Sequence, residues 1–348
     1  MKYFLFILTA ILVSSCGIQH NSPTSTNPNR QVPPNTTIVF VDQNGAFYPK
    51  DWSRVYGKPP KNGRKNVYSL SKIASEKGKE KDLAKFEKDF LNALQIQLKN
   101  DKRVFILIHG FNAKSSNVNR QYEQIASRLN LNKTDEIIQF YWDGLYTSNP
   151  FSSMKTWFTA ADNSQYAGKF ALRKILNVMS NKEIYLISHS RGASVVLSAL
   201  SSAPLDTAKM SILADVHNID TLQSDNILKN RNNKITAIAL APAIGKSDFE
   251  IKVNGDTTVH MVKFTPQLKS LHITTNKDDM MLKKVIGFMS NKLNPTDLGY
   301  KSDSFNQLAE QYKFMKRSDF TGQKSHDFER YVTNKKFIEL LKQYKLAK

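Results

Sequence analysis

A serine with the surroundings of a nucleophile lies mid-chain, within the pentapeptide Ser-His-Ser-Arg-Gly at 188–192. An apolar run precedes it and a run of small apolar residues follows, which predicts a strand, a tight turn and a helix in that order. Such a turn lifts the hydroxyl of Ser190 out of the sheet, and Gly192 lets the strand and the helix approach closely. Ser188 stands where such turns usually have glycine, but it is still small. The pattern favours Ser190 as a nucleophile; the alternative is a turn in which a serine only caps the helix.

A second motif, His-Gly-Phe-Asn at 109–112, follows another apolar run. Gly110 allows the backbone to approach a substrate without a side chain in the way. A loop in this position can donate one backbone N–H to a developing oxyanion, and the residue after the nucleophile can donate the other. Phe111 and Arg191 are therefore the expected donors. We interpret His109 as a structural histidine that hydrogen-bonds the loop.

Together the two motifs resemble those of bacterial α/β-hydrolases that carry a His-Gly-Phe-Asn motif, over roughly residues 104 to 326. The resemblance implies a mostly parallel sheet with helices on both faces and a catalytic serine, acid and histidine in that order along the chain. It implies a serine hydrolase without a cofactor. No metal site is expected either, because the remaining histidines and carboxylates lack the His-Glu-x-x-His spacing.

The base and the acid of such an enzyme follow its last two strands. His326 is the only histidine near the C-terminus and is our candidate base; the alternative is a solvated loop histidine. For the acid, the family pattern is an aromatic residue, a small hydroxyl residue, two variable positions and an aspartate; Thr274 departs from the aromatic, but Thr275 and Asp278 fit. We predict Asp278, with Asp279 and Asp248 as rivals. An aspartate here also favours the start of the helix that follows.

The resemblance implies that Ser190 attacks an ester carbonyl, His326 takes the serine proton and Asp278 orients the imidazole. A covalent acyl-enzyme would form, and activity should fall at acid pH because the imidazole must be neutral to act. The expected substrate is a small-molecule or lipid ester. The competing class is an envelope protein that keeps the fold as a binding scaffold without catalysis.

Strands and helices alternate along the chain, which independently predicts a parallel sheet covered on both faces. The functional loops of such a sheet lie at the carboxyl ends of its strands. Residues 143–165 are rich in large apolar side chains that could line an acyl pocket, form a cap or pack onto the core. Expected strands cover 37–41, 104–108, 137–142, 184–187, 235–241 and 271–275; expected helices cover 83–98, 121–129, 167–179, 193–200, 280–288 and 335–344.

The N-terminus has the pattern of an export signal. Residues 1–15 contain an apolar run at 3–13 that is too short to span a bilayer. The Val-Ser-Ser-Cys sequence at 13–16 resembles a bacterial lipobox, which implies cleavage before Cys16 and acylation of that residue. Gly17 follows, and the resemblance implies an outer-membrane destination. The alternatives are an ordinary signal peptide with a chance cysteine, or a buried strand.

Residues 16–35 form the predicted link between a lipid anchor and the domain at 36–348. They are rich in Asn, Pro, Ser and Thr, so they indicate a flexible tether. The chain has a formal net charge of +20, with lysines spread along most of its length, which is typical of a solvated surface weakly attracted to anionic lipid. No nucleic-acid partner is expected, because no zinc-finger or RNA-binding motif is present. The oligomeric state stays open.

Overall fold

The computed structural model describes residues 17–25, 32–59, 68–202, 228–252, 259–283 and 295–347. The predicted signal peptide at 1–15 and the predicted lipidation site Cys16 lie outside the described residues. Within the described parts of the chain, no helix combines the length and apolarity needed to cross a membrane.

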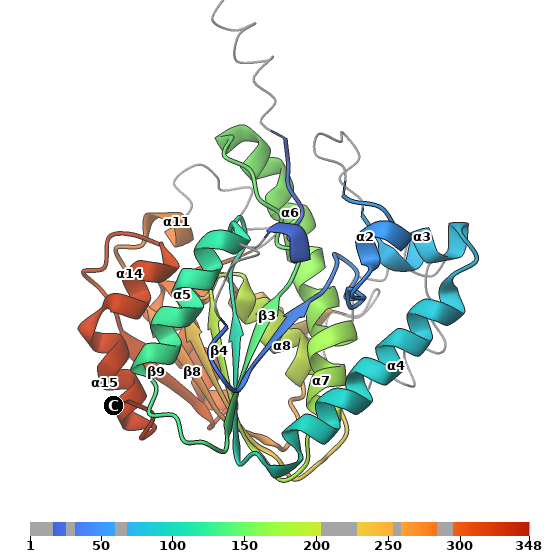
Figure 1. Ribbon diagram of the computed structural model, residues 1–348. Helices are drawn as coiled ribbons and strands as arrows, with labels where there is room; N and C mark the ends of the chain where they lie inside the picture. Colours follow the sequence, from blue (N-terminus) through green and yellow to red (C-terminus); the bar gives the residue numbers. More distant parts are fainter. Residues whose placement is uncertain are drawn as a thin grey trace, which may run out of the picture.

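A seven-stranded sheet forms the centre of the molecule, with the order β1-β3-β2-β4-β5-β8-β9 and every neighbouring pair parallel (Figure 1). The predicted α/β fold is thereby confirmed. A separate antiparallel pair joins β6 (Glu250–Lys252) to β7 (Val259–Met261). The strands of the main sheet are β1 (Thr36–Phe40), β2 (Arg103–Ile108), β3 (Asp135–Tyr141), β4 (Glu183–His189), β5 (Lys234–Leu240), β8 (Leu268–Thr275) and β9 (Met315–Asp319).

The central strands are apolar throughout because both of their faces are covered. In β2, Val104 and Ile106 join the core on one side of the sheet, whereas Phe105 and Leu107 join the core on the other. All four side chains are fully buried. Burial of each stabilises the fold by roughly 1.5–3 kcal/mol, so successive residues hold helices on opposite faces.

Helices pack on both faces of the sheet (Figure 1). One face carries α4 (Glu80–Gln97), α6 (Pro150–Tyr166), the π-helical η3 (Ala167–Leu172), α7 (Arg173–Asn177), α8 (Gly192–Leu200) and α13 (Ser302–Gln311). The other carries α5 (Ser115–Arg128), α14 (Phe328–Thr333) and α15 (Lys335–Gln343). The shorter elements are η1 (Pro23–Ser25), α2 (Trp52–Val55), α3 (Leu70–Glu76), η2 (Leu98–Asn100), η4 (Lys246–Phe249), α11 (Met280–Lys283) and η5 (Asp297–Gly299).

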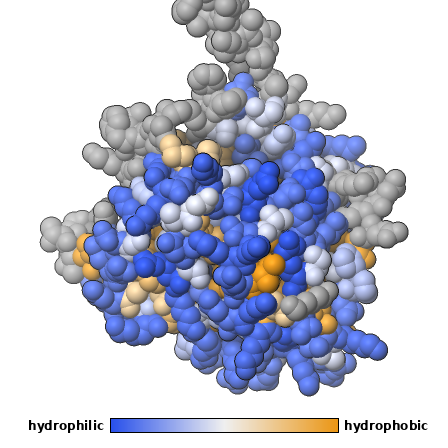
Figure 2. Space-filling model, turned by 90° about the vertical axis from the view of Figure 1, so that its left-hand side faces the viewer, coloured by the Kyte–Doolittle hydropathy of each residue, from blue (hydrophilic) through white to orange (hydrophobic). Residues whose placement is uncertain are grey.

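The lysine-rich surface follows from the amphipathic helices. Helix α15 buries Phe337, Leu340 and Leu341 against the sheet and exposes Lys335 and Lys342. Figure 2 looks onto the side of the molecule that carries α14 and α15, and hydrophilic residues cover most of it. The basic residues of this helix therefore form a solvated face over an apolar one.

Three predicted helices differ in extent from the observed ones, and the first of them, predicted at 121–129, is α5, which begins six residues earlier at Ser115. The helix expected at 167–179 begins earlier, because α6, η3 and α7 follow one another without a break from Pro150 to Asn177. Small and polar residues interrupt the apolar stripe of α6, which hides its helical period in the sequence. The helix expected at 280–288 is described only over α11, since 284–294 lie outside the described residues.

The tether prediction is wrong for residues 17–25, which pack onto the domain beside α6 (Figure 1). Gln19 and Tyr146 exchange two backbone hydrogen bonds of 2.8 Å. The Nδ1 atom of His20 lies 2.5 Å from the Oδ2 atom of Asp143, and both side chains are buried. The backbone N–H of Asn21 donates to the Oδ1 atom of Asp143 over 3.0 Å.

The side chain of Asn21 extends the same contact to the loop after β2. Its Nδ2 group donates to the carbonyl of Ala113 over 3.2 Å, and its Oδ1 atom accepts from the Ser115 hydroxyl over 2.9 Å. Composition indicated disorder because the segment has little apolar surface to bury. The segment is ordered instead because the Nδ1 atom of His20 and the backbone and side chain of Asn21 meet partners in the loops that follow the strands.

We expect the variant His20→Gln to lose stability in a pH-dependent way. Burial lowers the pKa of His20, but attraction to Asp143 and Asp42 outweighs it and leaves the pKa above the ordinary 6.5. Stability from a raised pKa is fully present below the unfolded value and is lost as pH rises through the folded one. The variant should therefore be about 3 kcal/mol less stable than wild type at about pH 6, and the gap should shrink by about pH 8.5.

Chemical denaturation of the two proteins at both pH values measures this gap. The matched control is His260→Gln, since His260 is exposed on β7. A gap that does not change with pH would show that the ion pair with Asp143 is not what holds the segment.

Candidate active site

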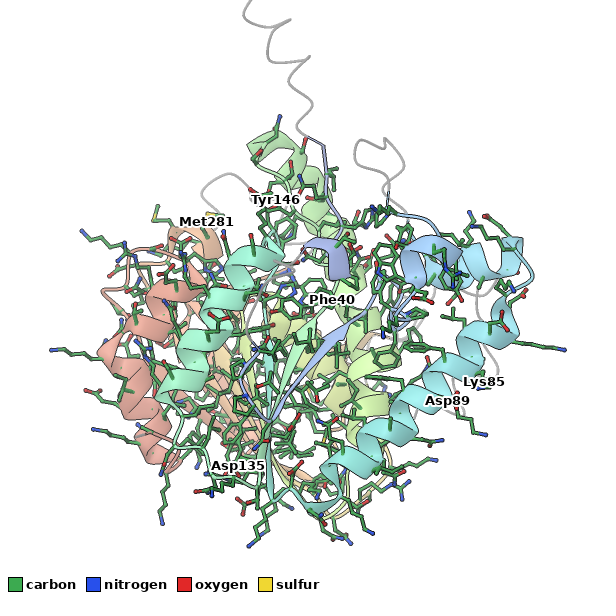
Figure 3. The ribbon with its side chains drawn as sticks, viewed as in Figure 1. Phe40, Lys85, Asp89, Asp135, Tyr146 and Met281 are labelled. Carbon is green, nitrogen blue, oxygen red and sulfur yellow. The ribbon has the colours of Figure 1, made fainter. Side chains whose placement is uncertain are left out.

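The loops that follow β2, β3, β4, β8 and β9 meet at one edge of the sheet, because parallel strands all end there. Figure 3 labels Tyr146 and Met281 at this edge and Asp135 at the opposite one. Ser190 follows β4 directly, and His326 lies between β9 and α14. Residues far apart in the chain therefore meet at this edge.

Ser190 occupies a strained turn between β4 and α8. Its φ angle is +51°, a left-handed conformation that a non-glycine residue adopts at a cost of about 1–3 kcal/mol. The turn is held by a 2.9 Å hydrogen bond from the Ser190 N–H to the carbonyl of Leu240. A Cβ on Gly192 would lie only 2.5 Å from the carbonyl oxygen of His109, so this position requires glycine. Ser188 fits without a clash and is buried.

Three side chains form a hydrogen-bonded chain at this edge. The Nε2 atom of His326 lies 2.8 Å from the Oγ atom of Ser190. The Nδ1 atom of the same ring lies 2.7 Å from the Oδ2 atom of Asp279. The imidazole can therefore take a proton from the serine while the carboxylate fixes its orientation.

The choice of Asp278 as the acid is wrong in this geometry. Asp278 is exposed, and its Oδ2 atom accepts from the backbone N–H of Gly322 over 2.9 Å. The rival Asp248 accepts from the N–H of Gly245 over 2.8 Å. Asp279 is the residue that turns inward and is fully buried. The family spacing points one residue too early because the turn after β8 directs consecutive side chains in different directions.

Asp279 meets partners with both carboxylate oxygens. Its Oδ1 atom accepts from the backbone N–H groups of Met281 and Leu282, at the start of α11, over 3.1 and 3.2 Å. Its Oδ2 atom accepts from the Tyr331 hydroxyl over 2.9 Å as well as from His326. Burial would raise the pKa of Asp279, but these hydrogen bonds lower it below its ordinary value. One aspartate thus both caps a helix and contacts the imidazole, and it stays ionised.

Three residues that were not predicted from the sequence hold the hydrogen-bonded side chains in place: Asn276, His189 and Tyr331. The Nδ2 group of Asn276 donates to the Tyr331 hydroxyl over 2.7 Å. The Nε2 atom of His189 lies 2.9 Å from the carbonyl oxygen of His326, and its ring stacks on Phe328. Burial and the neighbouring His326 lower the pKa of His189, so its ring is neutral. Tyr331 has no distinguishing signal in the sequence, because it reads as one more apolar position of a C-terminal helix.

The loop after β2 lies against the nucleophile. A Cβ on Gly110 would lie 2.9 Å from the Cβ atom of Ser190, so no other residue fits there. Asn112 has a φ angle of +54°; its N–H donates to the carbonyl of Gly144 over 3.2 Å, and its Oδ1 atom accepts from the N–H of Thr147 over 2.7 Å. These bonds fix the loop that contains Phe111 beside Ser190.

His109 has the structural role that the sequence indicated. Its Nδ1 atom lies 2.8 Å from the carbonyl oxygen of Gly110, and its own carbonyl accepts from the Trp142 indole over 2.7 Å. Its ring also stacks on Trp142. Burial lowers the pKa of His109 to about 4, so the ring is neutral and holds the loop.

The apolar residues at 143–165 were predicted to line an acyl pocket, form a cap or pack onto the core. The two halves of α6, which includes most of these residues, have different contacts. The second half packs on the core, where the Ser164 hydroxyl donates to that of Ser194 over 3.0 Å. In its first half, Trp157 makes an edge contact with Phe111 at 5.2 Å between ring centroids. The guanidinium carbon of Arg191 lies 4.5 Å from the centroid of the Trp157 ring. This half of α6 therefore covers the two loops next to Ser190.

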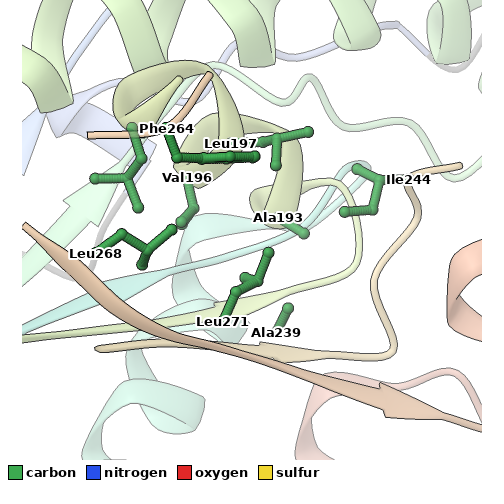
Figure 4. A pocket seen from close by; sticks show the side chains of 9 residues that line it. Ala193, Val196, Leu197, Ala239, Ile244, Phe264, Leu268 and Leu271 are labelled. Atoms are coloured by element: carbon green, nitrogen blue, oxygen red, sulfur yellow. The ribbon is translucent and has the colours of Figure 1, made fainter. Parts of the chain in front are cut away.

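An apolar cavity lies behind the site, between α8 and the strands β5 and β8 (Figure 4). Ala193, Ile244, Phe264 and Leu271 are among the side chains that line it. Its volume of about 10 Å³ is room for one water-sized particle, so it is too small to accept an acyl chain. Among the described residues, no group of three or more His, Cys, Asp or Glu could hold a metal ion.

The parallel sheet, with a serine on the strained turn after β4 and a histidine–aspartate pair against it, defines an α/β-hydrolase. The chain belongs to the family described as alpha/beta hydrolase of unknown function (DUF900), whose model matches residues 84–335. The search of curated proteins finds no match.

One solved structure, of an uncharacterized protein from Bacillus cereus ATCC 10987, is similar at 11% sequence identity, covering 80% of this chain and 76% of that chain. Its TM-score is 0.32, so this likeness adds no argument about fold or function.

We expect Asp279→Asn to slow the reaction of Ser190 far more than Asp278→Asn. Loss of the carboxylate leaves the imidazole in the wrong tautomer, which costs about 10⁴-fold in rate in a comparable triad. Asp278→Asn should stay within about threefold of wild type, as surface changes do. The rate of labelling by a fluorophosphonate probe measures both variants. If Asp278→Asn proved the slower of the two, the assignment of Asp279 would fail.

Proposed function

We propose that this chain is a serine hydrolase that cleaves carboxylic esters through a covalent acyl-enzyme. The observation that carries the proposal is the unbroken chain of hydrogen bonds from Ser190 through His326 to Asp279. Each residue type stands where its chemistry is needed. The buried carboxylate orients the ring, the ring accepts a proton, and the strained turn presents the hydroxyl.

In the first half of the proposed reaction, the Oγ atom of Ser190 attacks the ester carbonyl carbon. The Nε2 atom of His326 takes the serine proton and then delivers it to the alcohol oxygen as the carbon–oxygen bond to the alcohol breaks. In the second half, water attacks the acyl-enzyme, His326 takes a proton from that water and returns it to Ser190, and the acid product leaves. Asp279 stabilises the imidazolium in both halves.

The proposed oxyanion hole consists of the backbone N–H groups of Phe111 and Arg191. The N–H groups of Ser190 and Asn112 already donate to Leu240 and Gly144 respectively. The resemblance to hydrolases with a His-Gly-Phe-Asn motif supports the assignment of Phe111, and each such donor contributes about 3 kcal/mol to the transition state.

The proposed location is the bacterial envelope, with Cys16 as a lipid anchor in the outer membrane. The contact between Gln19 and Tyr146 supports an active site near the bilayer, because it ties the chain three residues after Cys16 to the edge that carries Ser190. Met280 and Met281 are exposed apolar side chains directly after Asp279. A lipid ester or a small ester near the membrane surface is the proposed substrate class.

A fluorophosphonate probe tests the proposed chemistry, because it reacts covalently with an activated serine. Wild type should be labelled within minutes, and Ser190→Ala should not be labelled at all, since the attacking oxygen is gone. Ser194→Ala is the matched control, because Ser194 lies one turn later on α8. An unlabelled but correctly folded wild type would instead favour a non-catalytic binding scaffold. Chromogenic esters of increasing acyl length then define the substrate.

Mass spectrometry of the mature N-terminus tests the anchor. We expect a first residue Cys16 that carries acyl chains on its sulfur and its amino group, because several chains are needed for stable anchoring. Cys16→Ser should leave the signal peptide in place, because the modified thiol is required for cleavage. An unmodified or uncleaved wild-type N-terminus would refute the lipoprotein assignment.

A further inference from the structure

Arg191 has a buried guanidinium with unused hydrogen-bond donors next to the nucleophile. The side chain is 2% exposed. Among the described residues, its Nε and Nη2 groups have no hydrogen-bond partner. A buried cation with open donors is unfavourable unless an anion joins it, so a residue of this kind normally has a function.

The two open donors lie on the same edge of the guanidinium, the edge that binds a carboxylate with two parallel hydrogen bonds. The chain itself provides an example. Arg103 uses its Nε and Nη2 groups to bind the two oxygens of Asp135. Arg191 presents the same pair of donors without an anion.

The charge of Arg191 persists at neutral pH. Burial lowers its pKa to about 10, although Asp248 and Asp162 act in the opposite direction. The guanidinium carbon also lies 4.5 Å from the centroid of the Trp157 ring, a cation–π contact that uses neither Nε nor Nη2 as a hydrogen-bond donor. These contacts hold the donors in position without occupying them.

The first half of α6, which covers the loops next to Ser190, also contacts Arg191 through Trp157. Ser190 is itself only 5% exposed, so an ester that reaches it must displace part of that cover. Trp157 contacts both Phe111 and Arg191, so opening at this helix uncovers the proposed oxyanion loop and the guanidinium together. A group of the substrate near its scissile bond would then meet the open donors.

We propose that the side chain of Arg191 binds an anionic group of the substrate, a carboxylate or a phosphate, close to the scissile ester. The inference rests on the proposed ester hydrolysis and specifies its substrate class. The planar fork of arginine matches both anions, whereas a neutral acyl chain would leave the buried Nε and Nη2 donors unpaired. The enzyme is thus selective for esters that carry a negative charge.

A matched pair of chromogenic esters tests this selectivity with the full-length protein. One is the aryl monoester of glutaric acid, and the other is the aryl valerate, which has a methyl group where the first has a carboxylate. Wild type should prefer the anionic ester in kcat/KM by about thirtyfold, the amount expected for hydrogen bonds between charged groups. Arg191→Gln should abolish the preference, and Arg191→Lys should leave a smaller one, because lysine keeps the charge but loses the fork.

The control variant Arg54→Gln changes an exposed arginine far from the site and should keep the wild-type preference. An equal loss on both esters in Arg191→Gln, or a wild type that does not prefer the anion, would overturn the proposal. If Arg191→Gln does not fold, the ratio measured for Arg191→Lys decides instead.

Binding to the variant Ser190→Ala separates this inference from the proposed chemistry, because it needs no turnover. Thermal unfolding with added glutarate or inorganic phosphate should show stabilisation of Ser190→Ala by one of the two anions. The additional change Arg191→Gln should remove that stabilisation. Stabilisation by glutarate indicates a carboxylate substrate, and stabilisation by phosphate indicates a phosphate-bearing one. Stabilisation by neither anion would overturn the anion site even if the serine is active.

Discussion

The imidazole of His326 connects the Ser190 hydroxyl to the Asp279 carboxylate, and much of the surrounding structure holds this ring in place. Its two ring nitrogens meet Ser190 and Asp279 at 2.8 and 2.7 Å. These partners follow different strands, so only a sheet with aligned carboxyl ends can bring them together. The backbone of the same residue is held by His189, and the carboxylate by Tyr331. His326 lies on a loop, but its hydrogen bonds to residues at the ends of strands fix its position.

The loops around this histidine are strained, and the core offsets that strain. Ser190 and Asn112 both adopt positive φ angles, which the continuously apolar strands beneath them can support. The close approach of Gly110 to Ser190 leaves no room for a side chain. Rigid strands, tight turns and small residues therefore act together, and a looser sheet could not keep the backbone donors beside the hydroxyl.

The sequence predicted what depends on local pattern and missed what depends on partners. The apolar runs at 104–108 and 184–187 predicted buried strands because burial on both faces leaves a continuous signal. Ser190 and His326 could be proposed from the sequence because their positions in the chain order are restricted, and the structure places the two side chains within hydrogen-bonding distance. Asp279 was assigned second to Asp278 because the direction of a side chain in a turn is a three-dimensional property. The polar edge strand β9 and the ordered structure of residues 17–25 could not be predicted from local pattern. Both are held in place by hydrogen bonds to residues far away in the sequence.

Three buried ionisable side chains differ in whether their polar atoms have hydrogen-bond partners in the protein. His20 is paired with Asp143, and the Asp279 carboxylate accepts hydrogen bonds from His326, Tyr331 and the backbone of α11, so in each case polar partners compensate for desolvation. Arg191 is equally buried, yet its Nε and Nη2 groups have no hydrogen-bond partner among the described residues. The first two pairs stabilise the loops at the edge of the sheet in the free protein. Asp248 and Asp162 attract the charge of Arg191, but its two open donors are paired only when a ligand supplies an anion, which links desolvation of the site to recognition of the substrate.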